Sequence, residues 1–215
     1  MAEKTQGEEL KEKLFNNKKN GWETISQEEG QKIFKYCEGY MDFLNKSKTE
    51  REIVKNAKQI AEEHGFKDIE QCQNLQPGDK VYYVNREKNL FLAVIGKENI
   101  ENGINIIGSH ADSPRLDLKP NPIYEEKGFV YFKTHYYGGI KKYQWTTIPL
   151  SMHGVIVKTN GEKIEINIGE KDEDPIFTIT DLLPHLAQEQ MQKKLKDGIE
   201  GEKLILFPHL RNLFL

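Results

Sequence analysis

Residues 104–120, INIIGSHADSPRLDLKP, constrain the fold more than any other segment of the chain. The segment opens with an almost continuously apolar run, which is typical of a strand buried on both faces of a sheet. A polar cluster that includes His110 and Asp112 follows where such a strand ends. Open α/β sheets bind ligands at the carboxyl ends of their strands. The segment therefore predicts a buried strand with a functional site at its end.

His110 and Asp112 are the candidate site residues of this segment. Residues two apart in an extended chain point to the same side, so Asp112 can accept a hydrogen bond from one ring nitrogen of His110. The other ring nitrogen is then free to bind a metal ion. The alternative is a purely structural role, in which the pair caps a turn. A His-x-Asp tripeptide is common, and by itself it favours the structural role.

Composition excludes several classes of function. The 215 residues carry a net charge of −3, with 31 basic and 34 acidic side chains, so no overall positive field attracts nucleic acid or an anionic membrane. Cys37 and Cys72 form no CxxC pair and are too few for a disulfide framework. No apolar run approaches the roughly 18 residues of a membrane helix, and the N-terminus has no apolar signal core. These features predict a cytoplasmic protein.

The first part of the chain is predicted to be helical and then to form a sheet. Ser26 and Glu29 have the spacing of a capping box and begin a helix over residues 24–47. Thr49 and Glu52 begin a second helix, for which Gly65 is the expected end. Three strands are expected to follow, the first two as a hairpin, over residues 80–84, 89–96 and 104–110.

The pattern changes after Pro120, where a Pro-rich break precedes a series of short strand-like runs. Turn signals at Gly138–Gly139 and Asn160–Gly161 separate these runs. The strands are expected over residues 129–137, 146–157 and 163–169, with a final helix over residues 180–198. The second half is therefore predicted to be a β-rich module with one helix.

Three segments together resemble the aspartyl aminopeptidase / aminopeptidase I family of zinc metallopeptidases. GSHADSPRLDLKP is similar to that family's H-x-D-S-P segment. HYYGGIKKYQW resembles its Tyr-Gly-Gly segment with a following tryptophan, here Tyr137, Gly138, Gly139 and Trp145. LSMHGVIV lies where the family has a strand that contains a leucine and a glycine. The resemblance extends over roughly residues 10–200, and the combination is more specific than any single segment.

The resemblance implies an α/β fold in two parts. Residues 1–119 correspond to part of the catalytic α/β domain. Residues 120–215 correspond to a β-rich domain that is inserted into the catalytic domain and builds dimers and larger particles. The resemblance thus implies a homo-oligomer, and it implies two zinc ions in the full family site. It also implies peptide substrates with a free N-terminus. The absence of a nucleic acid or membrane partner is expected from the composition, not from the resemblance.

The resemblance also assigns roles to three residues. His110 matches the family's first metal ligand, and Asp112 matches the acid that orients this histidine. His185 lies near the position of a histidine that reaches the active site of a neighbouring subunit, which implies a substrate-binding role. The alternative for His185 is an exposed helix histidine. His135 and His153 match no functional position.

The chain also departs from the family pattern. Family members are about twice as long, and their remaining metal ligands and general base follow the inserted domain. Thr146 and Thr147 stand where some members carry an Asp-Arg pair, which favours the aminopeptidase I-like branch. The Glu-Glu pair at residues 125–126 is expected in a solvated turn. The apolar ending EKLILFPHLRNLFL is expected to depart from the family and to have nothing that buries it. The inserted domain is accordingly expected to be incomplete or altered there, as in an interrupted or frame-shifted gene.

Two functions from different classes follow. The first is a zinc-dependent aminopeptidase that releases N-terminal amino acids from peptides, with His110 and Asp112 as the part of its site present here. The second is a catalytically inactive, truncated remnant or assembly module that pairs with itself or with full-length subunits. Catalytic zinc requires about three protein ligands, and a single imidazole binds zinc weakly.

Overall fold

The computed structural model describes residues 5–16 and 18–210, which form two compact units divided between Lys46 and Ser47. The first unit contains α1 (Gln6–Leu14), the short 3-10 helix η1 (Gly21–Glu23) and α2 (Gln27–Lys46). The predicted capping box begins α2: the Glu29 amide donates to Ser26 Oγ at 3.2 Å, and the Ser26 amide donates to the Glu29 carboxylate at 2.8 Å. The first predicted helix is therefore confirmed.

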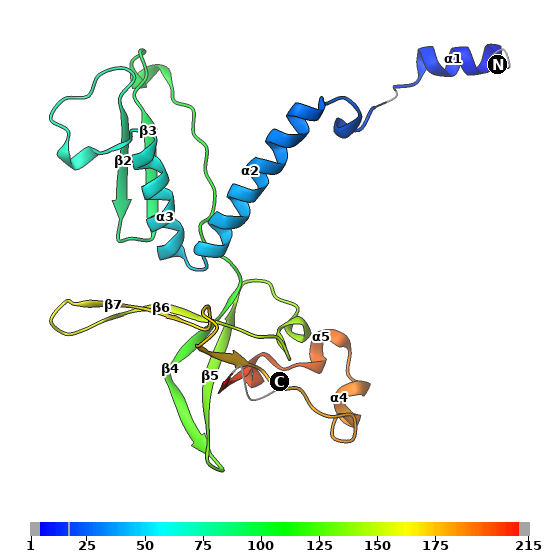
Figure 1. Cartoon of the computed structure of the whole chain (residues 1–215), viewed down its shortest axis with the longest axis vertical. Helices are drawn as coiled ribbons and strands as arrows, with labels where there is room; N and C mark the ends of the chain where they lie inside the picture. The colour runs from blue at the N-terminus through cyan, green and yellow to red at the C-terminus, as the bar shows by residue number, and fades with distance from the viewer. Residues whose placement is uncertain (1–4, 17, 211–215) are drawn as a thin grey trace. The chain divides into compact units, whose positions relative to one another are not determined.

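The second unit begins with the second predicted helix, α3 (Glu50–Glu63), which is also confirmed (Figure 1). Thr49 and Glu52 form the expected capping box. Gly65 has a φ of +84°, and the amide of Phe66 donates to the Ala61 carbonyl at 3.0 Å. A left-handed glycine with this hydrogen bond is a common way to end a helix, because it satisfies a carbonyl that the helix leaves unpaired.

A three-stranded sheet with the order β1-β2-β3 lies beside α3. It consists of β1 (Lys67–Asp68), β2 (Lys80–Asn85) and β3 (Asn89–Val94), and the short helix η2 (Ile69–Gln71) follows β1. β2 and β3 form the predicted hairpin, whose turn residues Arg86 and Glu87 both have positive φ. Such turns match the right-handed twist of the two strands. Val54 on α3 and Val81 on β2 are both 3 % exposed.

The strand predicted for residues 104–110 is wrong. After the short helix η3 (Ile100–Asn102), residues 103–114 form a coil that pairs with no described strand (Figure 1). Ile104, Ile106 and Ile107 are 61, 77 and 100 % exposed. The apolar pattern is that of a strand between two neighbours, and the described residues provide no neighbour for it. A strand without a partner has no strand to which its backbone N–H and C=O groups can hydrogen-bond, so these groups must bond to water.

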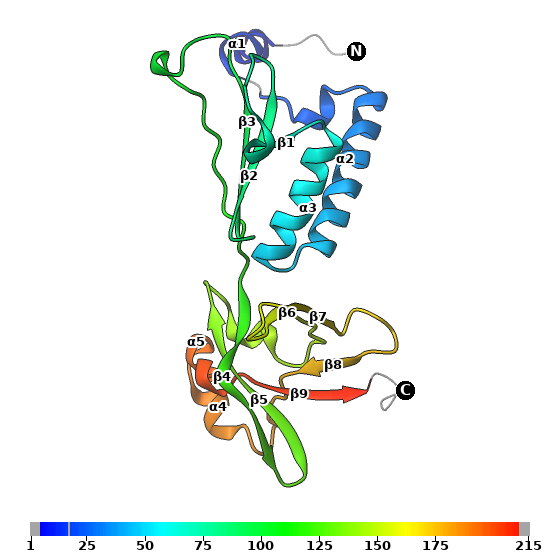
Figure 2. The ribbon, with the colours of Figure 1, turned by 90° about the vertical axis from the view of Figure 1, so that its left-hand side faces the viewer.

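A four-stranded antiparallel sheet with the order β4-β5-β9-β8 forms the β-rich part (Figures 1 and 2). Its strands are β4 (Arg115–Glu126), β5 (Phe129–Tyr137), β8 (Pro175–Thr178) and β9 (Ile205–Leu210). A separate hairpin pairs β6 (Met152–Val157) with β7 (Lys163–Ile168). The strands predicted over residues 129–137, 146–157 and 163–169 correspond to β5, β6 and β7, although β6 begins only at Met152.

The core of this sheet forms around four buried residues that come from two separate segments. Leu204 is fully buried, and it packs with the others in one cluster. The remaining members are Phe177, Ile179 and Leu206. The expectation that the apolar ending has nothing to bury it is therefore wrong for residues 204–209, which enter this core or pair with β5 or β8. Residues 211–215 of that run lie outside the described residues.

The single helix predicted over residues 180–198 is also wrong. The structure has only two short helices there, α4 (Gln188–Gln192) and α5 (Leu195–Gly198), with the short helix η5 (Gly201–Lys203) after them. Pro184 lies in the turns that precede α4. A proline inside a helix removes one backbone hydrogen bond and clashes with the preceding turn. None of the described helices is long and apolar enough to cross a membrane.

The domain boundary expected at residue 120 falls inside β4. The register between β4 and β5 shifts between Leu118 and Ile123, so the Pro-rich stretch is an irregularity within one strand. Proline lacks the amide that a ladder needs, and an edge strand such as β4 tolerates it. A division at this point into a catalytic part and an inserted module stays a prediction.

Candidate functional site

The structure brings His110 and Asp112 together at the end of the coil that precedes β4. His110 Nδ1 lies 2.9 Å from the backbone oxygen of Asp112 and 3.3 Å from its carboxylate Oδ1. Both partners are acceptors, so the network assigns the imidazole proton to Nδ1. Nε2 then carries the lone pair that a metal ion binds. The His110 side chain is 84 % exposed, so it is accessible.

Tyr137 completes this cluster from the second family-like segment. Its hydroxyl donates to Asp112 Oδ2 at 2.7 Å. This hydrogen bond is the main reason why the pKa of Asp112 is lowered and why the pKa of Tyr137 is raised. Asp112 is therefore held as an acceptor for both neighbours. The sequence indicates Tyr137 only as part of the Tyr-Gly-Gly segment, because 25 positions separate it from Asp112.

Arg115 supports the tyrosine from the strand beside it. Its guanidinium carbon lies 3.9 Å from the centre of the Tyr137 ring. The same guanidinium contacts Asp117 Oδ1 at 2.7 Å and Glu50 Oε1 at 3.0 Å. Because Glu50 is the first residue of α3, these contacts connect the helix to the site. No sequence signal joined Glu50 to this position.

Gly138 closes the contact between the two segments. Its φ is +80°, and a Cβ built on it would lie 3.5 Å from Pro114 Cα. The Tyr-Gly-Gly turn therefore packs directly against the end of the His-x-Asp-Ser-Pro segment. The two motifs that sequence analysis treated separately form one site.

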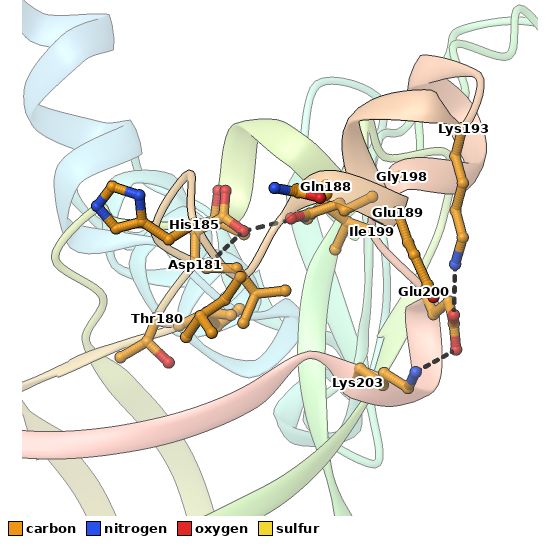
Figure 3. Close-up of a pocket in the computed structure, with 15 residues that line it drawn as sticks. Thr180, Asp181, His185, Gln188, Glu189, Lys193, Gly198, Ile199, Glu200 and Lys203 are labelled. Carbon is orange, nitrogen blue, oxygen red and sulfur yellow. Dashed lines mark hydrogen bonds and ion pairs between the residues drawn. The ribbon is translucent and has the colours of Figure 1, made fainter.

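His185 lies in a different place. It lines a cavity of about 550 Å³ bounded by residues 179–203 and Thr146, and neither His110 nor Asp112 takes part in it. Figure 3 shows His185 on one side of this cavity, and Glu200 with its partners Lys193 and Lys203 on another. His185 is exposed, as the alternative expectation states. It lies in a turn before α4, however, and not in a helix. Its substrate-binding role stays a prediction.

Sequence reasoning missed a second histidine cluster around His153. This side chain is 8 % exposed, with Nδ1 2.8 Å from a Glu52 oxygen and Nε2 3.0 Å from a Glu170 oxygen. Ser151 Oγ donates to the same Glu170 oxygen at 2.9 Å. Glu52 and His153 are 101 positions apart, so no local pattern could have indicated their contact.

The described residues do not by themselves fit a catalytic zinc ion. They contain no group of three or more His, Cys, Asp or Glu side chains placed to hold a metal ion. His110 provides one imidazole nitrogen, whereas a catalytic zinc ion has about three protein ligands. The chemistry of the cluster on its own is to hold one histidine in a single tautomer with Nε2 as an acceptor.

Comparison with known proteins places this chain in a family. Residues 43–212 match the family described as aminopeptidase I zinc metalloprotease (M18). A probable M18 family aminopeptidase 1 from Borreliella afzelii is 54 % identical over 188 residues, which cover 87 % of this chain and 41 % of that protein. The chain therefore spans about two fifths of the length of this relative.

Two crystal structures share the fold. An M18 aminopeptidase from Thermotoga maritima is 45 % identical with a TM-score of 0.81, and the match covers 90 % of this chain and 42 % of that one. Aminopeptidase I from Clostridium acetobutylicum is 40 % identical with a TM-score of 0.79, over 90 % and 43 % of the two chains. The α/β fold class is thereby confirmed.

The family match also corrects the expectation for the apolar ending. It extends to residue 212, so the segment that contains β9 belongs to the part that the family shares, and a departure from the family pattern after residue 203 was wrongly expected. The match covers all the segments that carried the resemblance. The chain belongs to the aminopeptidase I (M18) family of zinc metalloproteases.

Proposed function

We propose that this chain contributes the first metal ligand and the inserted β-rich module of a zinc-dependent aminopeptidase that releases N-terminal amino acids from peptides. The observation that carries the proposal is the position of His110, with its Nδ1 held by Asp112 and its Nε2 left as a ligand. Membership of the M18 family supports it. The family resemblance further supports two zinc ions and substrates of the aminopeptidase I-like branch. The low cysteine content, without a CxxC pair, supports a cytoplasmic location.

Each residue of the cluster has a defined part in this function. Zinc, when bound, polarises a scissile carbonyl and lowers the pKa of bound water. Asp112 keeps the proton of His110 on Nδ1, and Tyr137 holds Asp112 in place. The described residues provide one candidate ligand, so the proposal requires further ligands from outside them.

The β-rich part, residues 120–215, is proposed to join copies of the chain into an oligomer. Among the described strands β4 pairs only with β5, so it is an edge strand whose other side offers backbone groups for pairing. Ile123 on β4 is 66 % exposed, and Phe129 at the start of β5 is 53 % exposed. An exposed edge with large apolar side chains is a surface that a second copy can cover.

A second candidate function is a catalytically inactive, truncated remnant or assembly module. Two observations favour it: the described residues hold a single candidate ligand, and the apolar coil before His110 is exposed. Such a module pairs with itself or with full-length subunits. For the activity of the 215 residues alone, this candidate predicts no peptide hydrolysis.

Hydrolysis of aminoacyl anilides separates the two candidates. The purified 215-residue protein is assayed with leucyl and aspartyl anilides, with added zinc or cobalt, and with and without a chelator. His110→Ala is compared with His64→Ala, which removes an exposed histidine at the end of α3. Activity lost with the chelator and in His110→Ala, but kept in His64→Ala, supports the aminopeptidase.

The opposite result is equally informative. A folded, soluble protein without hydrolysis in any of these conditions supports the inactive module for this chain. Activity that His110→Ala leaves unchanged contradicts the assignment of His110 as a ligand. A higher rate on leucyl than on aspartyl anilide supports the aminopeptidase I-like branch.

A further inference from the structure

We propose that Tyr137 is a positioning residue: through Asp112 it fixes the ring orientation and the tautomer of His110. The inference rests on the proposed function, because it deepens the description of the same site. The tyrosine of the Tyr-Gly-Gly segment thereby positions the histidine of the His-x-Asp-Ser-Pro segment. Three steps of geometry carry it.

The first step concerns the two oxygens of Asp112. Oδ2 accepts the Tyr137 hydroxyl at 2.7 Å, and Oδ1 lies 3.3 Å from His110 Nδ1. The tyrosine therefore determines which carboxylate oxygen faces the histidine. The backbone oxygen of Asp112, 2.9 Å from the same Nδ1, moves with this residue. Holding Asp112 thus holds both acceptors of His110.

The second step concerns what holds Tyr137. Arg115 and Tyr137 are directly opposite partners in the antiparallel ladder of β4 and β5. The guanidinium lies 3.9 Å from the ring centre and is fixed in turn by Glu50 and Asp117. A planar guanidinium with two carboxylate partners has little freedom, and it stacks well on an aromatic face. The hydroxyl is therefore presented by two paired strands.

The third step concerns what His110 lacks. Its side chain is 84 % exposed, and residues 103–114 have no regular secondary structure. Packing therefore contributes little to its orientation, and its hydrogen bonds decide it. In a neutral imidazole the proton is on Nδ1 or on Nε2, and the partner of one nitrogen selects the tautomer. Releasing Asp112 should let both tautomers of His110 form.

The experiment measures the tautomer directly. The full 215-residue protein is labelled with ¹⁵N-histidine, and two-bond ¹H–¹⁵N spectra are recorded above about pH 8, where an ordinary histidine is neutral. His110→Gln identifies the His110 signals. In the unmodified protein we expect the proton mainly on Nδ1. In Tyr137→Phe we expect the ratio of the Nδ1–H to the Nε2–H form to fall by about threefold or more, as one hydrogen bond is lost.

Tyr136→Phe is the matched control. Tyr136 is the neighbour of Tyr137 in β5, and its side chain points to the opposite face of the strand. Its ring centroid lies 5.0 Å from that of His135, and its ladder partner in β4 is Leu116. Removal of its hydroxyl should leave the His110 tautomer ratio unchanged. The signals of His153, buried in the other cluster, report whether the fold is intact.

A ratio that falls in Tyr137→Phe alone, with the His153 signals unchanged, supports the proposal. An unchanged ratio in Tyr137→Phe overturns it, and so does an equal fall in Tyr136→Phe. If Tyr137→Phe does not fold, Arg115→Lys is used, which keeps the hydroxyl and the charge but loses the planar stack. A smaller fall in the ratio then supports the proposal, and an unchanged ratio overturns it. Because no hydrolysis is measured, this result is independent of whether the chain is an active peptidase.

Discussion

Gly138 is the residue that lets the two family-like segments meet. Its φ of +80° lies in the left-handed region, which strains any residue with a Cβ. Pro114 packs against it, with Cα 3.5 Å from the position that a Cβ would take. Gly139, the next residue, has no positive φ and no atom within 4 Å of its Cβ position. A methyl group would therefore force a strained backbone conformation at residue 138, but not at residue 139.

We therefore expect Gly138→Ala to lower the free energy of unfolding by about 1–2 kcal/mol, because alanine must adopt the left-handed conformation. Gly139→Ala is the control and should be nearly neutral. The measurement is the urea midpoint of each variant at an unchanged slope. Equal effects of the two substitutions would show that the turn relaxes and that the left-handed conformation of residue 138 is not required.

Whether a contact between two residues could be predicted depends on how far apart they lie in the sequence. His110 and Asp112 are only two residues apart, so their proximity is visible in the sequence alone, although the segment is coil and not the expected strand. The partners Tyr137 and Glu52 are 25 and 101 positions from Asp112 and His153, respectively. Those contacts depend on how strands and helices pair. No local pattern contains that information.

At the scale of elements, β9 shows why an apolar run needs its neighbours to be interpreted. Leu206 is 7 % exposed because β9 lies between β5 and β8. We expect Leu206→Ala to lower the free energy of unfolding by about 2–5 kcal/mol, through lost burial and the cavity that it leaves. Leu195→Ala, at a leucine 67 % exposed in α5, should change it by less than about 0.5 kcal/mol.

Urea unfolding of both leucine variants provides the measurement. A small effect of Leu206→Ala would contradict the placement of β9 in the middle of the sheet. It would favour instead the original expectation of an apolar ending that nothing buries. A large effect of Leu195→Ala would indicate that another surface covers α5.

Elements with local signals were predicted well, and those without them were not. The capping boxes that begin at Ser26 and Thr49 locate the starts of α2 and α3. They are visible in the sequence because the two residues of each box are only three positions apart. The hairpin of β2 and β3 follows from its turn. Residues 104–110 have the composition of a central strand, but pairing requires partners that the described residues do not provide. Pro184 is the local signal that argues against one long helix over residues 180–198.

At the scale of the whole second unit, His153 connects segments far apart in the sequence. It joins Glu52 on α3 to Glu170, which follows β7. Burial, the largest influence on Glu170, raises its pKa; hydrogen bonds from Ser151 and His153 and the charge of Lys48 outweigh it, so the pKa is lowered. A carboxylate with a lowered pKa stabilises the fold above its unfolded-state pKa, and this contribution is lost as pH falls through the folded-state pKa.

We expect Glu170→Gln to destabilise the protein near neutral pH, and we expect the difference from the unmodified protein to shrink as pH falls below the ordinary value of 4.5. Urea midpoints at about pH 7 and at about pH 4 test this, with the exposed Glu173→Gln as the control. A difference that is the same at both pH values would mean that the altered hydrogen bonding of the amide group, and not the loss of the charge, causes the effect.

The strand order β4-β5-β9-β8 has a consequence for how the protein folds while it is synthesised on the ribosome. β4 and β5 emerge early, but the strand that separates β5 from β8 is the last of the described strands to be synthesised. Translation proceeds at about 5–20 residues per second, so β5 has an open edge for several seconds before β9 arrives. During that interval the nascent chain exposes the unpaired edge of β5 to other polypeptides. Slow codons before residue 205 should lengthen this exposure and increase the share of newly made protein that aggregates or is captured by chaperones.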